Sequence, residues 1–256
     1  MTMKRIAITL GALLAALPAF AGTEETFEKA FSLDGVTRVS VENVNGRIDA
    51  IAWDKPYLRI KAVKTARGSD AEETLKQTEI RVRKVGDRIE IVTVSPQRRR
   101  LFGFLDWGSR HATVDYEIHV PPSTDVRFET TNGKVEAAGF VGNMDAEAVN
   151  GSIDLKDVEG PVRATTVNGS LRVAFKGNLK KSRLETVNGS VDVSFDKKSS
   201  VSYDLETVNG RIEGDFPISV EGKFGPKEAR GSYNGGGETL KVETVNGSIR
   251  LKIPSP

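Results

Sequence analysis

Hydrophobic and polar residues alternate along most of this chain, and the alternation is punctuated by regularly spaced Asn-Gly pairs. The stretch from Leu184 to Val193 reads Leu-Glu-Thr-Val-Asn-Gly-Ser-Val-Asp-Val, and variants of it recur along the sequence. The spacings are 18 (132 to 150), 18 (150 to 168) and 20 (168 to 188). Such a period is typical of stacked repeats. We predict that the repeats turn at Asn45, Asn132, Asn150, Asn168, Asn188, Asn209 and Asn246.

The apolar residues fall into columns when the repeats are aligned on these Asn residues. Polar residues lie between the columns, which is the period-two signal of half-buried strands. Each repeat therefore predicts two short strands, one on either side of the Asn-Gly pair. Four residues before the Asn stand Val41, Phe128, Ala146, Ala164, Leu184, Leu205 and Val242, and three after it stand Ile48, Val135, Ile153, Leu171, Val191, Ile212 and Ile249.

Two all-β architectures fit this pattern. Asn-Gly favours a tight hairpin, which would give an antiparallel meander. That hairpin would set Glu185 opposite Asp192, and like charges directly opposite are destabilising. If the chain instead turns a corner into a second sheet, equivalent residues stack at about 4.8 Å, and the Asn side chains can hydrogen-bond along their column. We then expect the Val before each Asn to tip inward.

Stacking also piles up a column of Glu side chains, so the meander remains an alternative, but we favour the parallel β-solenoid. Its Glu column would consist of Glu129, Glu147, Glu185 and Glu206.

The pattern predicts a single solenoid domain over residues 22–256. Its N-terminal part, 22–120, carries insertions at 65–78 and 96–111, and the regular array, 121–256, carries one at 217–237. In the first insertion Ser69 is the predicted N-cap of one short helix that ends near Gln77. We expect the final repeat, Leu240 to Ile253, to close the array. Its free edge would be protected by Lys241, Arg250, Lys252 and Pro254.

The first residues have the composition of an export signal. Lys4 and Arg5 precede an apolar run from Ile6 to Leu17, which is too short to span a bilayer. Ala19-Phe20-Ala21 offers a small-residue cleavage site, so residues 1–21 are the predicted signal peptide. The sequence thus predicts a periplasmic or secreted protein that begins at Gly22. The chain has no Cys, which excludes disulfides.

The charge balance argues against a nucleic-acid partner. The chain has 37 Lys and Arg against 35 Asp and Glu, and removal of Lys4 and Arg5 leaves the two classes equal. Binding to nucleic acid depends on clustered basic residues that neutralise phosphates.

The repeat resembles a known family. Glu-Thr-Val-Asn-Gly-Ser with Ile or Val, the strand Val-Asp-Tyr-Glu-Ile-His-Val-Pro, and the closing Gly-Gly-Gly-Glu-Thr-Leu-Lys-Val-Glu-Thr-Val-Asn-Gly-Ser-Ile-Arg-Leu are similar to the bacterial putative-adhesin family, a domain of unknown function. The resemblance covers about Val36 to Ile253. It implies a right-handed parallel β-solenoid in the cell envelope, and it brings no catalytic residues.

The residues themselves offer little chemistry. Only His111 and His119 are present among histidines, and a hydrolase needs a nucleophile, a base and an orienting group in one place. Carboxylates such as Glu185 and Asp192 recur in nearly every repeat, whereas an active site is a local exception to a pattern. We therefore predict a non-enzymatic protein with no catalytic residue, no cofactor and no metal site. A carbohydrate-active enzyme on the same scaffold and divalent cations held by the carboxylates remain alternatives.

One irregular segment is the predicted partner contact. Three cations stand beside large apolar residues there, as in protein interfaces or lipid headgroup zones. The alternative is that the apolar residues cap an end of the core. The predicted contact residues are Arg98, Arg99, Arg100, Phe102, Phe104 and Trp107.

The resulting functional prediction is a monomeric, exported envelope scaffold or adhesin. It would bind an envelope protein, a glycan or a lipid surface. A partner protein of an envelope-stress response is the alternative to a direct binding role.

Overall fold

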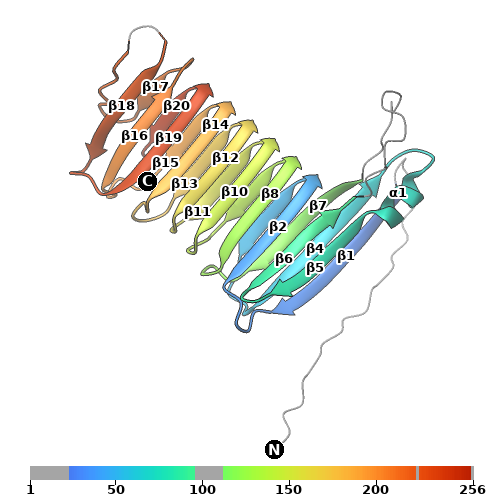
Figure 1. Cartoon of the computed structure of the whole chain (residues 1–256). Helices are drawn as coiled ribbons and strands as arrows, with labels where there is room; N and C mark the ends of the chain where they lie inside the picture. The colour runs from blue at the N-terminus through green and yellow to red at the C-terminus, as the bar shows by residue number, and fades with distance from the viewer. Residues whose placement is uncertain (1–22, 96–111, 223–224, 255–256) are drawn as a thin grey trace, which may run out of the picture.

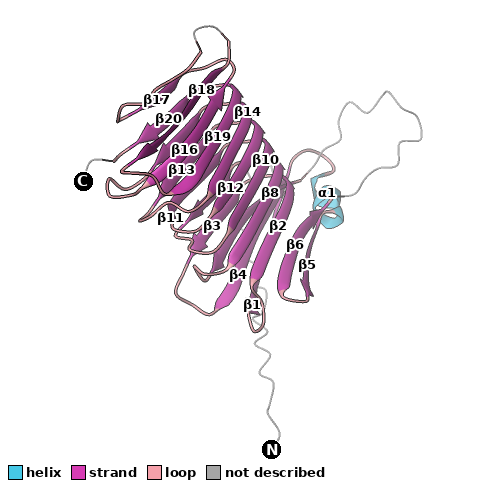
Figure 2. Ribbon diagram, turned by 60° about the vertical axis from the view of Figure 1, so that its left-hand side comes forward, coloured by secondary structure: helices cyan, strands magenta, loops and turns pink. Residues whose placement is uncertain are grey.

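The computed structural model describes residues 23–95, 112–222 and 225–254. Two sheets of ten strands each lie face to face and enclose one hydrophobic core (Figures 1 and 2). Sheet I has the order β1 (Thr23–Ser32), β4 (Tyr57–Ala66), β7 (Thr113–Val120), β3 (Ile48–Ala52), β9 (Val135–Ala138), β11 (Ile153–Val158), β13 (Leu171–Phe175), β15 (Val191–Ser194), β20 (Ile249–Lys252) and β17 (Ile212–Gly214). Sheet II has the order β18 (Lys227–Tyr233), β16 (Val201–Thr207), β19 (Glu238–Asn246), β14 (Ser182–Asn188), β12 (Val162–Asn168), β10 (Met144–Asn150), β8 (Asp125–Asn132), β2 (Arg38–Asn45), β6 (Arg88–Val94) and β5 (Glu79–Val85).

Parallel pairing of equivalent residues confirms the predicted solenoid and excludes the hairpin meander. Each repeat forms a coil: one strand of sheet II, its Asn-Gly corner, and the following strand of sheet I. Asn150 pairs with Asn132 on one side and Asn168 on the other, and Ile153 pairs in the same way with Val135 and Leu171. The arrowheads of β2, β8, β10, β12 and β14 accordingly point the same way (Figure 1). Among the described strands, the antiparallel pairs lie near the two ends of the stack, at β1–β4, β4–β7, β5–β6 and β16–β18.

The order of coils in the stack differs from their order in the chain. The final repeat does not close the array, because β19 lies between β14 and β16, and β20 lies between β15 and β17. The prediction that Lys241, Arg250, Lys252 and Pro254 protect a free edge is therefore wrong. The outermost strands at that end are β17 and β18. A similar exchange occurs at the other end, where β6 and β7 lie outside β2 and β3.

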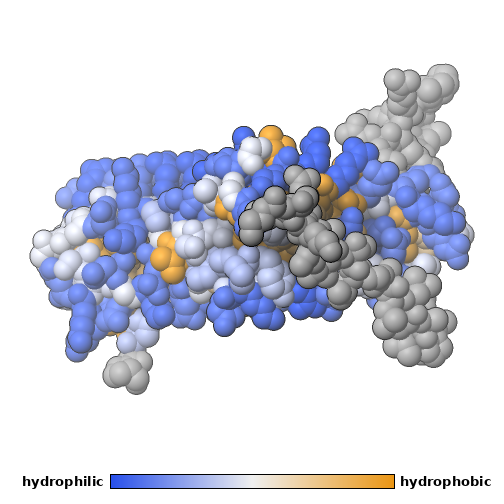
Figure 3. All heavy atoms as spheres, turned by 90° about the horizontal axis from the view of Figure 1, so that it is seen from below, coloured by the Kyte–Doolittle hydropathy of each residue, from blue (hydrophilic) through white to orange (hydrophobic). Residues whose placement is uncertain are grey.

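The predicted apolar columns form the core. The residues four before each corner Asn are completely buried, and so are those three after it except Ile212, which is 8% exposed. Alternation puts the intervening side chains outside, so the face seen in Figure 3 is mostly hydrophilic, with hydrophobic residues in small separate groups.

The single helix of the described chain, α1 (Ala71–Gln77), packs beside β4 and β1. Its N-cap is Asp70 rather than the predicted Ser69, whose hydroxyl lies 2.6 Å from the Asp70 carboxylate. Lys64 of β4 is 6% exposed, and its ammonium donates to the carbonyls of Leu75 and Thr78. The same ammonium pairs with Glu25 of β1 at 2.9 Å. One buried cation thus joins β1, β4 and the end of the helix, where carbonyls lack intrahelical partners.

Candidate functional site

The corner residues form a continuous ladder along one edge of the stack. Each Asn after Asn45 donates its side-chain N–H to the side-chain oxygen of the Asn in the preceding coil of the stack, at 2.8–2.9 Å. An amide has two N–H donors and two acceptor lone pairs, so an interior Asn keeps one of each available to solvent. In stack order the ladder is Asn45, Asn132, Asn150, Asn168, Asn188, Asn246 and Asn209.

At five of the seven corners the residue that points inward is Thr, not Val; Asn43 and Ala148 take that position at the other two. Thr166 is 1% exposed, and its hydroxyl donates to the Gly151 carbonyl of the preceding coil at 2.8 Å. Thr186 donates to Gly169 at 2.9 Å in the same way. Strand alternation continues through this position, so the next residue points outward. The expectation that Val tips inward is therefore wrong, and the sequence signal for the buried Thr was the uninterrupted period of two.

The corner Gly residues are required by close approach of the coils. A Cβ on Gly151 would lie 1.7 Å from the Gly133 carbonyl oxygen, and one on Gly169 would lie 2.1 Å from that of Gly151. Among the corner glycines only Gly46 has a positive φ, of 118°. The Gly thus serves backbone stacking rather than a hairpin turn.

These contacts produce a surface that we call the corner ridge. It consists of three parallel columns: the residue before each Asn, which is Val except for Thr131; the Asn itself; and the residue after each Gly. Its five most exposed Val residues are 39–42% exposed. From the coil of β10 to that of β19, the columns hold only Val, Asn and Ser, without a charged side chain. Those columns are Val149, Val167, Val187 and Val245; Asn150, Asn168, Asn188 and Asn246; and Ser152, Ser170, Ser190 and Ser248.

Charged side chains cover the outer face of sheet II. Arg127 donates to Asp145 at 2.7 Å and to Glu147 at 3.1 Å, and it also pairs with Glu129. Arg183 joins Glu185 and Glu243. Arg127 thus bridges the stacked Glu129 and Glu147, and Arg183 bridges the stacked Glu185 and Glu243, which offsets the repulsion of like charges within these two pairs.

A shallow hollow of about 370 Å³ lies on the outer face of sheet I. Four carboxylates cross it on adjacent strands, those of Glu117, Asp49, Glu136 and Asp154. Burial raises the pKa of Asp49 above its usual value, and Glu136 adds to the rise, although Arg47 at 3.1 Å opposes it. The hydrogen bond from Lys134 lowers the pKa of Glu136.

His119 packs next to this hollow and is not part of a catalytic constellation in the described chain. Its ring lies 4.9 Å from that of Trp53, which in turn contacts Tyr57 edge-on at 4.7 Å. Burial lowers the pKa of His119, against the opposing charge of Glu117. The imidazole therefore serves as a largely neutral packing group at pH 7.

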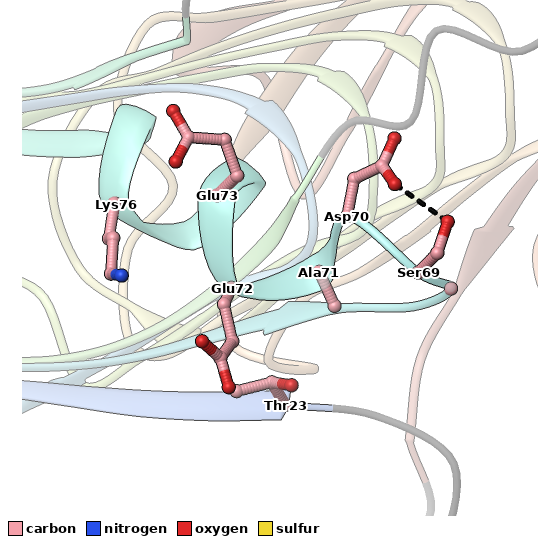
Figure 4. A pocket seen from close by; sticks show the side chains of 8 residues that line it. Thr23, Ser69, Asp70, Ala71, Glu72, Glu73 and Lys76 are labelled. Carbon is pink, nitrogen blue, oxygen red and sulfur yellow. Dashed lines mark hydrogen bonds between the residues drawn. The ribbon is translucent and has the colours of Figure 1, made fainter.

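A second pocket, of about 430 Å³, lies at the start of α1 (Figure 4). It is lined by Asp70, Glu72 and Glu73 of the helix region, by Lys76, and by Thr23 of β1. The Ser69 hydroxyl donates a hydrogen bond to the Asp70 carboxylate. No histidine is among the described residues that line this pocket.

The described residues contain no group of three or more His, Cys, Asp or Glu that could hold a metal ion. Within them, no helix is both long and apolar enough to cross a membrane. The predicted contact residues Arg98, Arg99, Arg100, Phe102, Phe104 and Trp107 lie outside the described residues, as do His111 and the predicted signal peptide.

The profile of the Toastrack family, DUF4097, matches residues 35–252. Among solved structures, the chain is similar to a putative cell adhesion protein from Clostridium sporogenes, with 16% sequence identity and a TM-score of 0.46 over 91% of this chain and 100% of that one. A putative adhesin from Bacteroides fragilis is 11% identical, with a TM-score of 0.40 over 90% and 97% of the two chains. A putative lipid binding protein from Parabacteroides distasonis is 11% identical, with a TM-score of 0.28 over 89% and 96%. No curated protein matches the chain significantly.

Proposed function

We propose that this chain, which belongs to the Toastrack family, DUF4097, is a non-catalytic, exported scaffold of the bacterial cell envelope. The proposed scaffold binds an envelope component through repeated side-chain columns. Its export rests on the signal-like residues 1–21, with Lys4, Arg5 and the Ala19-Phe20-Ala21 site.

The observation that carries the binding role is the corner ridge. The side chains of Val149, Val167 and Val187 are 39–42% exposed. At most other outward positions the period-two pattern places polar residues instead. The Asn ladder and the buried Thr–Gly hydrogen bonds hold each column in place, so the ridge loses little conformational entropy when it binds. A rigid, repeated and partly apolar surface suits binding better than catalysis.

The charge pattern also supports a partner other than nucleic acid. Cations of the described faces, such as Arg127 and Arg183, are already paired with carboxylates, so they do not form a free basic track. The proposed partners are an envelope protein, a glycan or a lipid surface, bound by the monomer.

The test is cell fractionation combined with pelleting of purified mature protein on isolated cell envelopes. We expect the chain to be recovered outside the cytoplasm with Gly22 as its N-terminus, which mass spectrometry of the terminal peptide measures. We expect Val149→Asp with Val187→Asp to weaken pelleting about tenfold. The two positions are separated by one coil, so the new charges are not direct neighbours.

The matched control places the same two charges at Val85 and Val141, which are 46% and 47% exposed and lie off the ridge. This control should pellet like the unmodified chain. The proposal would be overturned if the chain stayed in the cytoplasm with residues 1–21 still attached. It would also be overturned if the ridge double variant and the control double variant pelleted equally well.

A further inference from the structure

We propose that the corner ridge binds an extended, uncharged chain of β-1,4-linked N-acetylhexosamines that lies along the stack axis. This inference rests on the proposed envelope function and names its ligand class. Three features of the ridge carry it: its translational period, its unused hydrogen-bonding groups and its lack of charge.

The period comes from the parallel stacking of the coils. Each coil advances by about the inter-strand spacing of 4.8 Å. The regular Asn–Asn distances of 2.8–2.9 Å show that this advance repeats from corner to corner. A linear polymer of similar units can therefore meet the same groups along the ridge. An extended β-1,4 glycan advances by about one inter-strand spacing per sugar. Successive sugars of such a chain face opposite ways, so alternate sugars present their acetamido groups to the ridge, at every second coil.

The hydrogen-bonding groups match an acetamido substituent. Each interior Asn spends one N–H and one oxygen lone pair in the ladder, which leaves one donor and one acceptor. An acetamido group also offers one N–H and one C=O. Beside the ladder, the Ser152 hydroxyl oxygen accepts the backbone N–H of Ser170 at 3.2 Å, and Ser190 accepts that of Ser248 at 3.3 Å. Their O–H groups remain able to donate to sugar oxygens.

The apolar column suits the carbon skeleton of the same ligand. Val149, Val167 and Val187 can pack against acetamido methyl groups and sugar C–H bonds, with a gain of about 25 cal/mol per Å² of apolar surface removed from water. The apolar column of the ridge is only one Val side chain wide, whereas a stable protein interface buries about 800 Å² on each partner. Its dimensions therefore favour a thin polymer over a second protein surface.

The absence of charge selects a neutral ligand and sets its length. The Ser column is occupied by Arg47 and Lys134 at one end and by Arg211 at the other. Between these cations lie four coils with uncharged columns, which correspond to about four sugars at one sugar per coil. A charged polymer would have to desolvate its charges there without an opposite charge to pair with.

The experiment is calorimetric titration of the mature full-length chain with N-acetylglucosamine oligomers of two to six sugars. We expect the affinity to rise about tenfold from the dimer to the tetramer and to change little beyond it. Val149→Asp with Val187→Asp should weaken binding of the hexamer about tenfold, whereas Val85→Asp with Val141→Asp should leave it unchanged. Cellohexaose, which lacks acetamido groups, and hexameric glucosamine, which is cationic, should bind at least about tenfold more weakly.

Absence of binding by the hexamer, equal binding of cellohexaose, or an equal loss in both double variants would overturn the inference. Envelope pelleting distinguishes this failure from that of the proposed function. If the ridge variant loses envelope binding while the hexamer does not bind, the envelope role stands and the glycan assignment is wrong. If the ridge variant keeps its envelope binding and the hexamer does not bind, both the envelope role and the glycan assignment are wrong. Thermal unfolding of each variant establishes that the two substituted chains are folded.

Discussion

At the scale of single residues, the Thr-Val-Asn-Gly sequence is explained by four different demands at one corner. Thr fills an inward position and needs the carbonyl that the preceding Gly supplies, at 2.8–3.0 Å in the coils of β12, β14 and β19. Val is the outward residue, Asn builds the ladder, and Gly permits contact between successive backbones. Because the groups that Thr, Asn and Gly meet all lie in the neighbouring coil, the motif is stable only in a stack.

The close approach of successive backbones at the corner glycines gives the first prediction. Gly151→Ala should destabilise the fold by at least about 3 kcal/mol, because its Cβ would overlap the Gly133 carbonyl oxygen and a stacked backbone cannot move aside. Gly177→Ala is the control: its φ is 71° but its surroundings are open, so only the left-handed backbone is penalised, by about 1–2 kcal/mol. Urea unfolding measures both. A smaller loss for Gly151→Ala than for Gly177→Ala would contradict close approach as the reason for Gly.

The second prediction concerns Asp49. Its Oδ1 is buried without a hydrogen-bond partner among the described residues, and its pKa is raised mainly by burial. A raised folded pKa means that folding favours the protonated form. Ionised Asp49 therefore lowers the free energy of unfolding. This loss of stability is absent below the unfolded pKa of 3.8, grows as the pH rises toward the folded pKa, and is constant above it.

Asp49→Asn should accordingly stabilise the protein at pH 7, by less than about 1 kcal/mol because solvent screens a partly exposed group. The gain should vanish below about pH 4. Melting temperatures of the two chains from pH 3 to pH 8 measure this difference. Asp54→Asn, an exposed position outside the hollow, should show no comparable change. A variant that is less stable at pH 7 than the unmodified chain would contradict the assignment.

At the scale of elements, the sequence predicts those features that follow from the strand period, and these are confirmed. The residues on either side of the corner, such as Leu184 and Val191, are completely buried, and the stacked pairing of Asn168 with Asn188 is present. The prediction that Val tips inward where the chain turns the corner is wrong because the alternation of the strand continues through the corner and leaves Val outside. A buried Thr is equally acceptable when a carbonyl lies within reach, and only the relation between coils reveals that carbonyl.

The ladder gives a prediction at this scale. Asn168→Ala removes a donated and an accepted hydrogen bond, to Asn150 and from Asn188, and should cost about 1–2 kcal/mol. Asn45→Ala, at the end of the ladder, removes only the bond accepted from Asn132 and should cost about 0.5–1 kcal/mol. Chemical unfolding compares the two, and equal losses would show that position in the ladder is irrelevant to stability.

At the scale of the whole molecule, the exchanged order of coils could not be predicted from the sequence. The repeat that ends with Asn246 is nearly identical to the one that ends with Asn188, so its pattern fits a slot with neighbours on both sides as well as an end position. What decides is the antiparallel strand β18, which pairs with β16 and brings the chain back so that β19 can enter between β16 and β14. The end position and the inner position of this repeat therefore differ in how the chain connects the strands, and not in the local sequence pattern.

The inserted coil leads to the last prediction, which compares two deletions. Removal of residues 238–256 takes away β19 and β20 and thereby separates β16, β17 and β18 from the rest of both sheets. It also breaks the ladder on both sides of Asn246 and leaves the inner faces around Leu205 and Leu184 without their shared neighbour, Val242. We expect this chain to lose its single cooperative unfolding transition and to aggregate through the newly exposed edges of β14 and β15.

Removal of residues 23–32 instead takes away only β1, which pairs with β4 alone and is mostly exposed, so that chain should stay monomeric and unfold cooperatively at a lower urea concentration. Circular dichroism in urea and size-exclusion chromatography measure both chains. A monomeric 1–237 chain with an unchanged unfolding midpoint would mean that the inserted coil does not hold this end of the stack together.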